Sequence, residues 1–284
     1  MVKLSTDQKI AIELGVKERK GLIKAAKRAA KRALSSNGKY HDTIIAGDSG
    51  VGKTFNITRE LDNLELDYYQ MTGNSSIFGF MGNLLYLHSC KPAGQKLVVF
   101  LDDCDFLFEP KNINILKNLT ATNPSDRKFE YSKKVEPKQF TEAQQNVLDN
   151  YLKDGLHGLT IPCDEFIFII SSNFVLPDAT QVEGMTKSQK QKYQDFEAIR
   201  GRTKAYDLQL SKQEKWGWLY DVGINDGALD MIDSEQDKLY LLDWLWSNWE
   251  RMKETSVRTI EKMGYEMVED PEDYKDYWEI DYLK

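Results

Sequence analysis

The sequence of 284 residues has little of what marks an extracellular or membrane protein. Its three cysteines, Cys90, Cys104 and Cys163, lie far apart among only three histidines, so the spacing predicts neither a disulfide framework nor a zinc site. We expect buried or partly buried thiols in a reducing cytosol. No apolar run approaches the roughly 20 residues that span a bilayer, and the first residues lack a secretory pattern. The sequence therefore predicts a soluble, cytoplasmic protein with no membrane partner.

A net positive charge is also lacking, since 38 Lys and Arg residues stand against 45 Asp and Glu residues, which argues against a protein coated with phosphate-binding surface. The formal net charge is -7 and the isoelectric point is near 5.2. The exception is an alanine-rich segment that predicts a helix. Its surface is either a nucleic-acid contact or a solvated helix face whose apolar side packs on the core, and both interpretations stay open. The basic residues of this segment are Lys17, Arg19, Lys20, Lys24, Lys27, Arg28, Lys31 and Arg32.

Residues 47–54 read Gly-Asp-Ser-Gly-Val-Gly-Lys-Thr and follow a short apolar run. The glycines let backbone N–H groups point at phosphate oxygens, Lys53 reaches the β- and γ-phosphates, and Thr54 ligates Mg²⁺ at the start of the next helix. A helix predicted over 55–61 supplies the strand–loop–helix context, which disfavours a chance glycine-rich turn. The expected nucleotide contacts are Gly47, Asp48, Ser49, Gly50, Val51, Gly52, Lys53, Thr54 and Phe55.

Two further strands are predicted to end in polar residues. The run 96–101 leads into Asp102-Asp103, a Walker B pattern in which Asp102 serves the Mg²⁺ and Asp103 orients or deprotonates the attacking water. The alternative is a strand that ends in helix-capping acids. The strand 165–170 is followed by Asn173, which can reach the γ-phosphate or the water if its strand lies between the other two. The three segments together predict a phosphate site at one sheet edge.

Composition shifts divide the chain into a basic segment 1–38, an α/β domain 39–210, a helical lid 211–265 and an acidic tail 266–284. Residues 118–162 look like an insertion of unassigned role, with a helix from Thr141 that a Thr-x-x-Gln cap predicts. A Ser-x-x-Glu capping box at Ser211 predicts the start of the lid, whose tryptophans we expect in the core. The tail is expected to be solvated or partly docked.

These motifs follow the order found in AAA+ ATPases, and the chain resembles that superfamily over roughly 40–264. The stretch Leu101–Asp105 and the compact lid are similar to AAA+ ATPases of tailed bacteriophages. The resemblance implies ATP and Mg²⁺ as cofactors. It also implies an α/β fold: a three-layer α/β/α P-loop NTPase sandwich with a five-stranded parallel sheet in the order 5-1-4-3-2, followed by a small helical lid.

Residue roles carry over from the resemblance. Asn173 matches sensor 1, Arg202 matches the arginine finger with Arg200 as a competitor, and Arg258 in the triplet 256–258 matches sensor 2. Because family members supply the finger across a subunit interface, the resemblance implies a homo-oligomer, commonly a hexameric ring or spiral.

The chain departs from the family at the end of the Walker B strand. There the family usually has Asp-Glu, whereas Asp103 is one methylene shorter than glutamate. Either a closer water compensates or hydrolysis is slow. Asp105 and Glu109 are possible substitutes.

Two functions follow as hypotheses. The first is an ATPase that acts on DNA in viral replication, repair or recombination, similar to clamp loaders, initiators or helicase loaders, in the host cytoplasm. The alternative is a protein-remodelling unfoldase that grips a client protein through Phe78 and Phe80. Those aromatics also fit an amphipathic helix over 77–88 that packs on the sheet, which the i, i+3, i+4 spacing favours. A small-molecule kinase is disfavoured, because it has no use for Asn173, Arg202 and Arg258 in this order.

Overall fold

The computed structural model describes residues 3–35, 41–73, 76–92, 94–152, 157–174 and 186–284. The chain forms two compact units. One comprises the chain up to Lys24, Asp48–Asn56 and Leu208–Lys284; the other comprises Ala25–Gly47 and Ile57–Asp207. The expected boundary at 38/39 lies outside the described residues.

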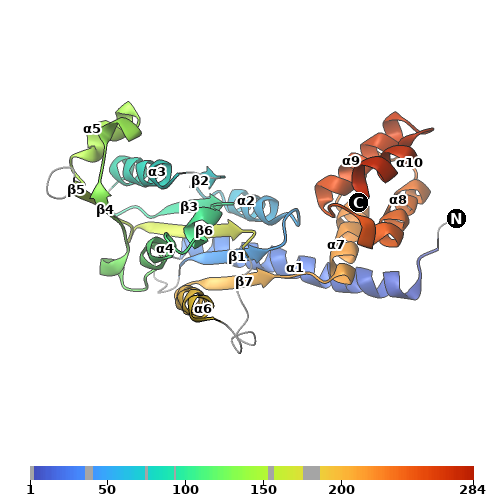
Figure 1. Cartoon of the computed structure of the whole chain (residues 1–284), viewed down its shortest axis with the longest axis horizontal. Helices are drawn as coiled ribbons and strands as arrows, with labels where there is room; N and C mark the ends of the chain where they lie inside the picture. Colours follow the sequence, from blue (N-terminus) through green and yellow to red (C-terminus); the bar gives the residue numbers. More distant parts are fainter. Residues whose placement is uncertain (1–2, 36–40, 74–75, 93, 153–156, 175–185) are drawn as a thin grey trace. The chain divides into compact units, whose positions relative to one another are not determined.

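The second unit is built on a five-stranded sheet with the order β2-β3-β6-β1-β7 (Figure 1). The strands are β1 Thr43–Gly47, β2 Tyr68–Thr72, β3 Leu97–Asp102, β6 Phe166–Ser172 and β7 Lys204–Leu208. β1, β6, β3 and β2 pair in parallel. The N–H of Lys204, at the start of β7, donates to the Asp42 carbonyl before β1, and the Leu208 carbonyl at the end of β7 accepts from the Asp48 N–H after β1. β7 therefore runs parallel to β1. Numbered among themselves, the five strands run 5-1-4-3-2 from β7 to β2.

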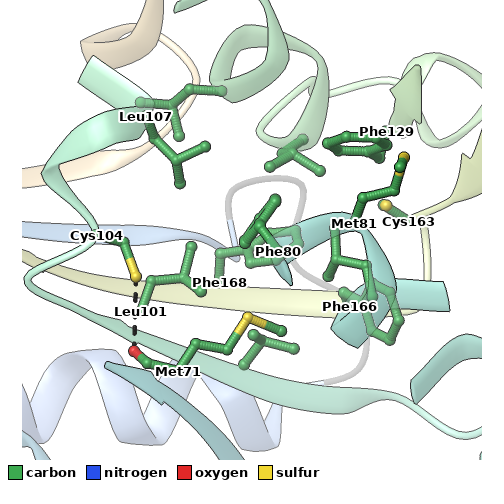
Figure 2. Close-up of a cluster of buried hydrophobic side chains, with 14 of the residues drawn as sticks. Met71, Phe80, Met81, Leu101, Cys104, Leu107, Phe129, Cys163, Phe166 and Phe168 are labelled. Atoms are coloured by element: carbon green, nitrogen blue, oxygen red, sulfur yellow. Dashed lines mark hydrogen bonds between the residues drawn. The ribbon is translucent and has the colours of Figure 1, made fainter. Parts of the chain in front are cut away.

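Buried apolar runs explain why β3 and β6 lie at the centre of this sheet. Every residue of β6 is buried, as parallel strands covered on both faces require. One face packs under helix α3, Ile77–Cys90, with Phe80 and Met81 above Leu101 and Phe168 (Figure 2). On the other face Arg32 donates to the Thr43 hydroxyl at 2.9 Å. The sheet therefore shows the expected α/β architecture.

The two aromatic residues at the start of helix α3, Phe78 and Phe80, pack against the core. Phe80 is 0 % exposed and its ring lies 5.6 Å from Phe106 and 5.9 Å from Phe129, measured between centroids. Phe78 packs edge-on against Tyr131 at 5.4 Å. The packing interpretation is confirmed, because both rings contact the core.

The expected insertion forms a small antiparallel pair, β4 Lys128–Lys134 with β5 His157–Pro162. Between them lies α5, Glu142–Leu148, whose Thr141 and Gln144 make the predicted capping box. Further helices of this unit are α4, Ile113–Leu119, and α6, Lys187–Arg200. The pair extends the sheet unit without joining its five-stranded sheet.

The first unit is helical. It contains α7 Lys212–Asn225, α8 Glu235–Asn248, α9 Val257–Glu269 and α10 Tyr274–Tyr277, orange to red in Figure 1. The predicted capping box of Ser211 and Glu214 opens α7. Trp216 and Trp218 are buried as expected. No helix among the described residues is long and apolar enough to cross a membrane.

One expectation about this unit needs correction, because the boundary at 265/266 falls inside α9. Of the two alternatives for the acidic tail, the docked one holds, since Trp278 is 0 % exposed and Leu283 pairs with Met252. The first part of α1, Thr6–Leu34, also belongs to this unit. There Arg19 pairs with Asp221 and Asp226. Burial of the Trp278 indole explains the docking, because it removes a large apolar area from water while Asp276 and Glu279 beside it stay exposed to solvent.

A candidate nucleotide-binding site

The P-loop joins β1 to α2, Lys53–Asn63. Gly50 and Gly52 adopt left-handed conformations with φ of +72° and +76°, which side-chain-bearing residues rarely adopt. The Asn56 amide closes the loop by donating to the Gly52 carbonyl at 2.8 Å. Because α2 begins at Lys53, its N-terminal N–H groups and dipole favour an anion at this loop.

Lys53 lies inside this loop and is 5 % exposed. Its ammonium donates to the Asp48 carbonyl at 2.7 Å. A nearly buried ammonium is stabilised by an anion close by. Thr54 is half-buried in the first turn of α2, whereas Phe55 beside it is 61 % exposed. The loop thus presents a buried cation and a helix N-terminus.

Asp102 ends β3 opposite Ser171 of β6 in the parallel register. Its carboxylate is 8 % exposed and accepts a long hydrogen bond of 3.4 Å from the Gln70 amide. The Ser171 hydroxyl is buried and has no hydrogen-bond partner among the described residues. A buried carboxylate beside an unsatisfied hydroxyl fits Mg²⁺, which binds through one or two carboxylates and keeps its waters. Within the described ranges no cluster of three His, Cys, Asp or Glu residues could form a complete protein cage.

Asp103 and Asn173 meet at the same edge. Asp103 has a positive φ of 54°, and its N–H donates to the Ser171 carbonyl at 3.1 Å. The Asn173 amide donates to Asp103 Oδ1 at 3.0 Å. Since β6 lies between β1 and β3, the condition for Asn173 to reach the phosphate region is met. The P-loop, Asp102, Asp103 and Asn173 all follow the carboxyl ends of neighbouring strands.

The possible substitutes for Asp103 are engaged elsewhere. The Ser172 hydroxyl donates to Asp105 at 2.5 Å, and Glu109 forms an exposed ion pair with Lys111 at 2.8 Å. Cys104 lies between the acids, and burial together with the Asp102 charge raises the pKa of its thiol to about 12. It is therefore a neutral core thiol.

The two arginines before β7 differ in their partners. Arg200 binds Asp207 at 2.6 Å and Glu197 at 3.4 Å. Arg202 is half-buried and donates to the Lys117 carbonyl at 2.7 Å, and no carboxylate pairs with it in the part of the chain described. A guanidinium on a neutral carbonyl is more readily recruited to a phosphate than one held by two carboxylates.

Helices α7 and α9 contact the P-loop, whose residues 48–56 belong to the same compact unit. Arg258 is exposed in the first turn of α9, and the preceding Val257 N–H donates to the Gly50 carbonyl at 3.3 Å. Ser256 caps α9, and Lys215 of α7 lies 3.7 Å from the Asp48 carboxylate. These contacts lie within one compact unit.

Sequence reasoning missed four residues at the site, for different reasons. Ser171 carried a signal, since a hydroxyl that ends an otherwise apolar strand is unusual. Ser256 carried one as well, since serine is a preferred residue at the start of a helix. Gln70 and Lys215 carried none, because their roles depend on which strand or loop lies beside them.

Comparisons with known proteins add little. No protein-family model and no curated protein sequence matches the chain. Among solved structures it is similar to S. cerevisiae Hsp104 in its complex with casein in an extended conformation, with 14 % identity and a TM-score of 0.42. The match covers 98 % of this chain and 49 % of that chain, so the chain spans about half the length of Hsp104 in that structure. The likeness is too distant to assign an activity.

Proposed function

We propose that this protein is a Mg²⁺-dependent ATPase of the AAA+ type that hydrolyses ATP to ADP and phosphate. The observation that carries the proposal is the strand order, in which β6 lies between β1 and β3. In this order the strands that lead into the P-loop, Asn173 and the Asp102-Asp103 pair are neighbours, and the Asn173 amide donates to Asp103 at 3.0 Å. Phosphoryl transfer needs positioning and charge more than covalent chemistry, and these residues supply both.

Each residue then has a definite task. With nucleotide bound, Lys53 would exchange the Asp48 carbonyl for phosphate oxygens, and Thr54 and Asp102 would hold the metal ion. Mg²⁺, when bound, neutralises charge that develops on the phosphates. Asn173 orients Asp103 through Oδ1, so that Oδ2 accepts the proton of the attacking water.

The remaining charges come from arginines. We assign the trans-acting finger to Arg202 rather than Arg200, because Arg200 is held by two carboxylates. Arg258, exposed at the start of α9, is assigned to sensor 2. A finger in trans requires a homo-oligomer, a hexameric ring or spiral by analogy with AAA+ ATPases, and the resemblance of Leu101–Asp105 supports a bacteriophage protein that acts in the host cytoplasm.

Phosphate release with ATP and Mg²⁺ tests the enzyme. We expect Asp102→Asn to lower kcat by about 10²-fold or more while nucleotide still binds. Lys53→Ala should lower both kcat and the affinity for nucleotide. Asp126→Asn is the control, since Asp126 is an exposed acid outside the site. Wild-type protein that releases no phosphate, or an Asp102→Asn protein as active as wild type, would overturn the assignment.

For the partner we propose DNA, bound through α1. Six basic residues between Lys17 and Arg32 of this helix are exposed, and at 100° per residue they fall within an arc of about 100° and a length of about 21 Å. The opposite side of the helix carries the buried Leu22, Ala26 and Ala30. No acidic residue lies between Arg19 and Leu34. The exposed cations, which we name the basic face, are Lys17, Lys20, Lys24, Lys27, Arg28 and Lys31.

Two members of the basic run do not belong to that face. Arg19 pairs with Asp221 and Asp226, and Arg32 donates to Thr43. The expectation that all eight contact DNA is therefore wrong for these two, because their charges support the fold. The six exposed positive charges of the basic face lie in a row along the helix, so they can contact successive phosphates of a DNA duplex.

The salt dependence of DNA binding tests the basic face. A Lys27→Gln, Lys31→Gln double variant should lower the slope of log affinity against log salt by about 2, since each phosphate contact contributes about 0.9. Lys133→Gln, Lys134→Gln on β4 removes the same charge from exposed positions elsewhere and should leave the slope unchanged. Equal slopes for the two variants would count against DNA as the partner of α1.

The alternative, a protein-remodelling unfoldase, loses its gripping residues. Phe80 is fully buried in the core, and Phe78 packs on Tyr131. A client protein would have to be held by other residues.

A further inference from the structure

The P-loop and helix α9 are in direct contact at Gly50. A Cβ added to Gly50 would lie 2.5 Å from Ser256 Cβ, so no larger residue fits there without displacing α9. The Val257 N–H donates to the Gly50 carbonyl at 3.3 Å. Ser256 is 2 % exposed, which means that the contact excludes water.

This contact orients one peptide group of the P-loop. In a trans peptide the C=O and the following N–H point to opposite sides. Because the Gly50 carbonyl points at Val257, the N–H of Val51 points away from α9. N–H groups directed into the loop are what a P-loop offers to phosphate. The start of α9 therefore helps to set a phosphate-binding donor.

Ser256 in turn fixes where α9 starts. Its hydroxyl accepts from the Thr259 N–H at 3.2 Å and shares a hydrogen bond of 3.0 Å with the Thr259 hydroxyl. Both side chains are buried. A second lid helix supports the same loop, since Lys215 of α7 lies 3.7 Å from Asp48. The loop is thus held by two helices that lie more than 160 residues away in the chain.

We propose that Ser256 is a positioning residue through which the lid controls nucleotide binding: its contact with Gly50 and the Val257 N–H hold the P-loop in its phosphate-binding form. The proposal rests on the ATPase function above and adds how that site is regulated. By reciprocity, nucleotide that favours this form of the loop also holds the start of α9 in place.

Titration of a fluorescent ATP analogue into Ser256→Ala tests the proposal. We expect a dissociation constant about fivefold higher than wild type, as loss of one N-cap predicts. Ser234→Ala is the matched control, because Ser234 caps α8 in the same unit and none of its hydrogen bonds involves the P-loop. The Ser234→Ala protein should bind the analogue with the dissociation constant of wild type, even if its melting temperature falls as much as that of Ser256→Ala.

Hydrogen exchange at the Val257 amide distinguishes a positioning role from a purely structural cap, because only the first predicts that bound nucleotide changes the exchange rate. Bound analogue should slow this amide in wild type and less in Ser256→Ala. Should Ser256→Ala fail to fold, Thr259→Val removes the hydroxyl partner of Ser256 at nearly constant volume. It should change the dissociation constant and the Val257 exchange in the same direction, by a smaller amount. Unchanged affinity in folded variants would overturn the positioning role alone, whereas wild type that binds no analogue would overturn the ATPase function as well.

Discussion

On the proposed ATPase function, Asp103 is the residue on which we expect the rate of hydrolysis to depend. Its carboxylate is one methylene shorter than the usual glutamate, but Asn173 holds it at 3.0 Å, and its φ of +54° turns the backbone at the strand end. Replacement by Asn keeps the shape and tolerates a positive φ, while it removes the proton acceptor. We therefore expect Asp103→Asn to lower kcat by about 10²–10⁴-fold at an unchanged nucleotide dissociation constant.

Single-turnover hydrolysis together with analogue titration separates the two quantities. Asp105→Asn serves as the control, because Asp105 accepts from the Ser172 hydroxyl rather than from Asn173. If the Asp105 variant lost the rate and the Asp103 variant kept it, the base would be Asp105.

A buried ion pair ties the inserted hairpin to the sheet. Arg127 binds Asp42 through two hydrogen bonds of 2.6 and 3.1 Å, and Asp42 also accepts from the Phe168 N–H at 2.8 Å. Both side chains are at least 94 % buried, since Arg127 is 6 % and Asp42 1 % exposed. Arg127→Met leaves a buried carboxylate without its counter-ion and should destabilise the sheet unit by about 3–5 kcal/mol.

Urea unfolding followed by circular dichroism measures that loss. Lys138→Met breaks an ion pair with Glu136 that is largely solvent-exposed and should cost under about 1 kcal/mol. A similar small loss in both variants would mean that Asp42 finds another partner.

The three cysteines should differ in reactivity. Burial raises the pKa of Cys104 and of Cys163 to about 12, so both stay protonated near pH 8, whereas Cys90 is exposed. A thiol reagent should label one cysteine in the native protein and three in denaturant. Cys90→Ser should abolish the native reaction; a remaining fast thiol would contradict the burial of the other two.

At the scale of elements, local patterns predicted much of the fold. The strands β3 and β6 were predicted because buried parallel strands read as continuous apolar runs, and the caps at Thr141 and Ser211 because their partners lie three residues away. The strand order then confirmed that Asn173 and Asp103 lie at one edge.

The features that were missed depend on distant partners. Arg19 looked like a surface cation because Asp221, its partner, lies 202 positions further along the chain. The contact of Ser256 with Gly50 and the burial of Trp278 were missed for the same reason. Periodicity describes which face of a helix is apolar but not which element covers it.

Helices α1 and α7 cross at two glycines, which gives a prediction for the helical unit. A Cβ on Gly217 would overlap the backbone of Ala11, and one on Gly15 would overlap that of Trp218. Although alanine favours a helix by about 1 kcal/mol, Gly217→Ala must separate the two helices, and we expect a net destabilisation of about 2 kcal/mol.

Tryptophan fluorescence in urea reports on this unit alone, because all six tryptophans lie between Trp216 and Trp278. Gly223→Ala on the same helix is a suitable control, since an added Cβ there meets only side-chain atoms, the nearest being Leu229 Cδ1 at 3.0 Å. A Gly217→Ala protein as stable as wild type would show that the helices do not pack this closely.

At the scale of the whole molecule, the assignment of Arg202 requires that one subunit completes the site of another. Arg202→Ala removes a finger that is worth about 10³–10⁵ in rate, and Lys53→Ala removes the phosphate-binding lysine, so each protein alone should be nearly inactive. In a mixed oligomer, however, an intact Lys53 meets an intact Arg202 at about a quarter of the interfaces if subunits assort at random. We expect equal amounts of the two variants to recover up to that fraction of wild-type phosphate release, with a dependence on total protein concentration. Arg200→Ala mixed with Lys53→Ala is the control, because the Arg200→Ala subunit keeps its own finger and should be active before mixing. Recovery that is absent although the variants co-assemble would place Arg202 in a structural role, where its bond to the Lys117 carbonyl joins the end of α6 to α4.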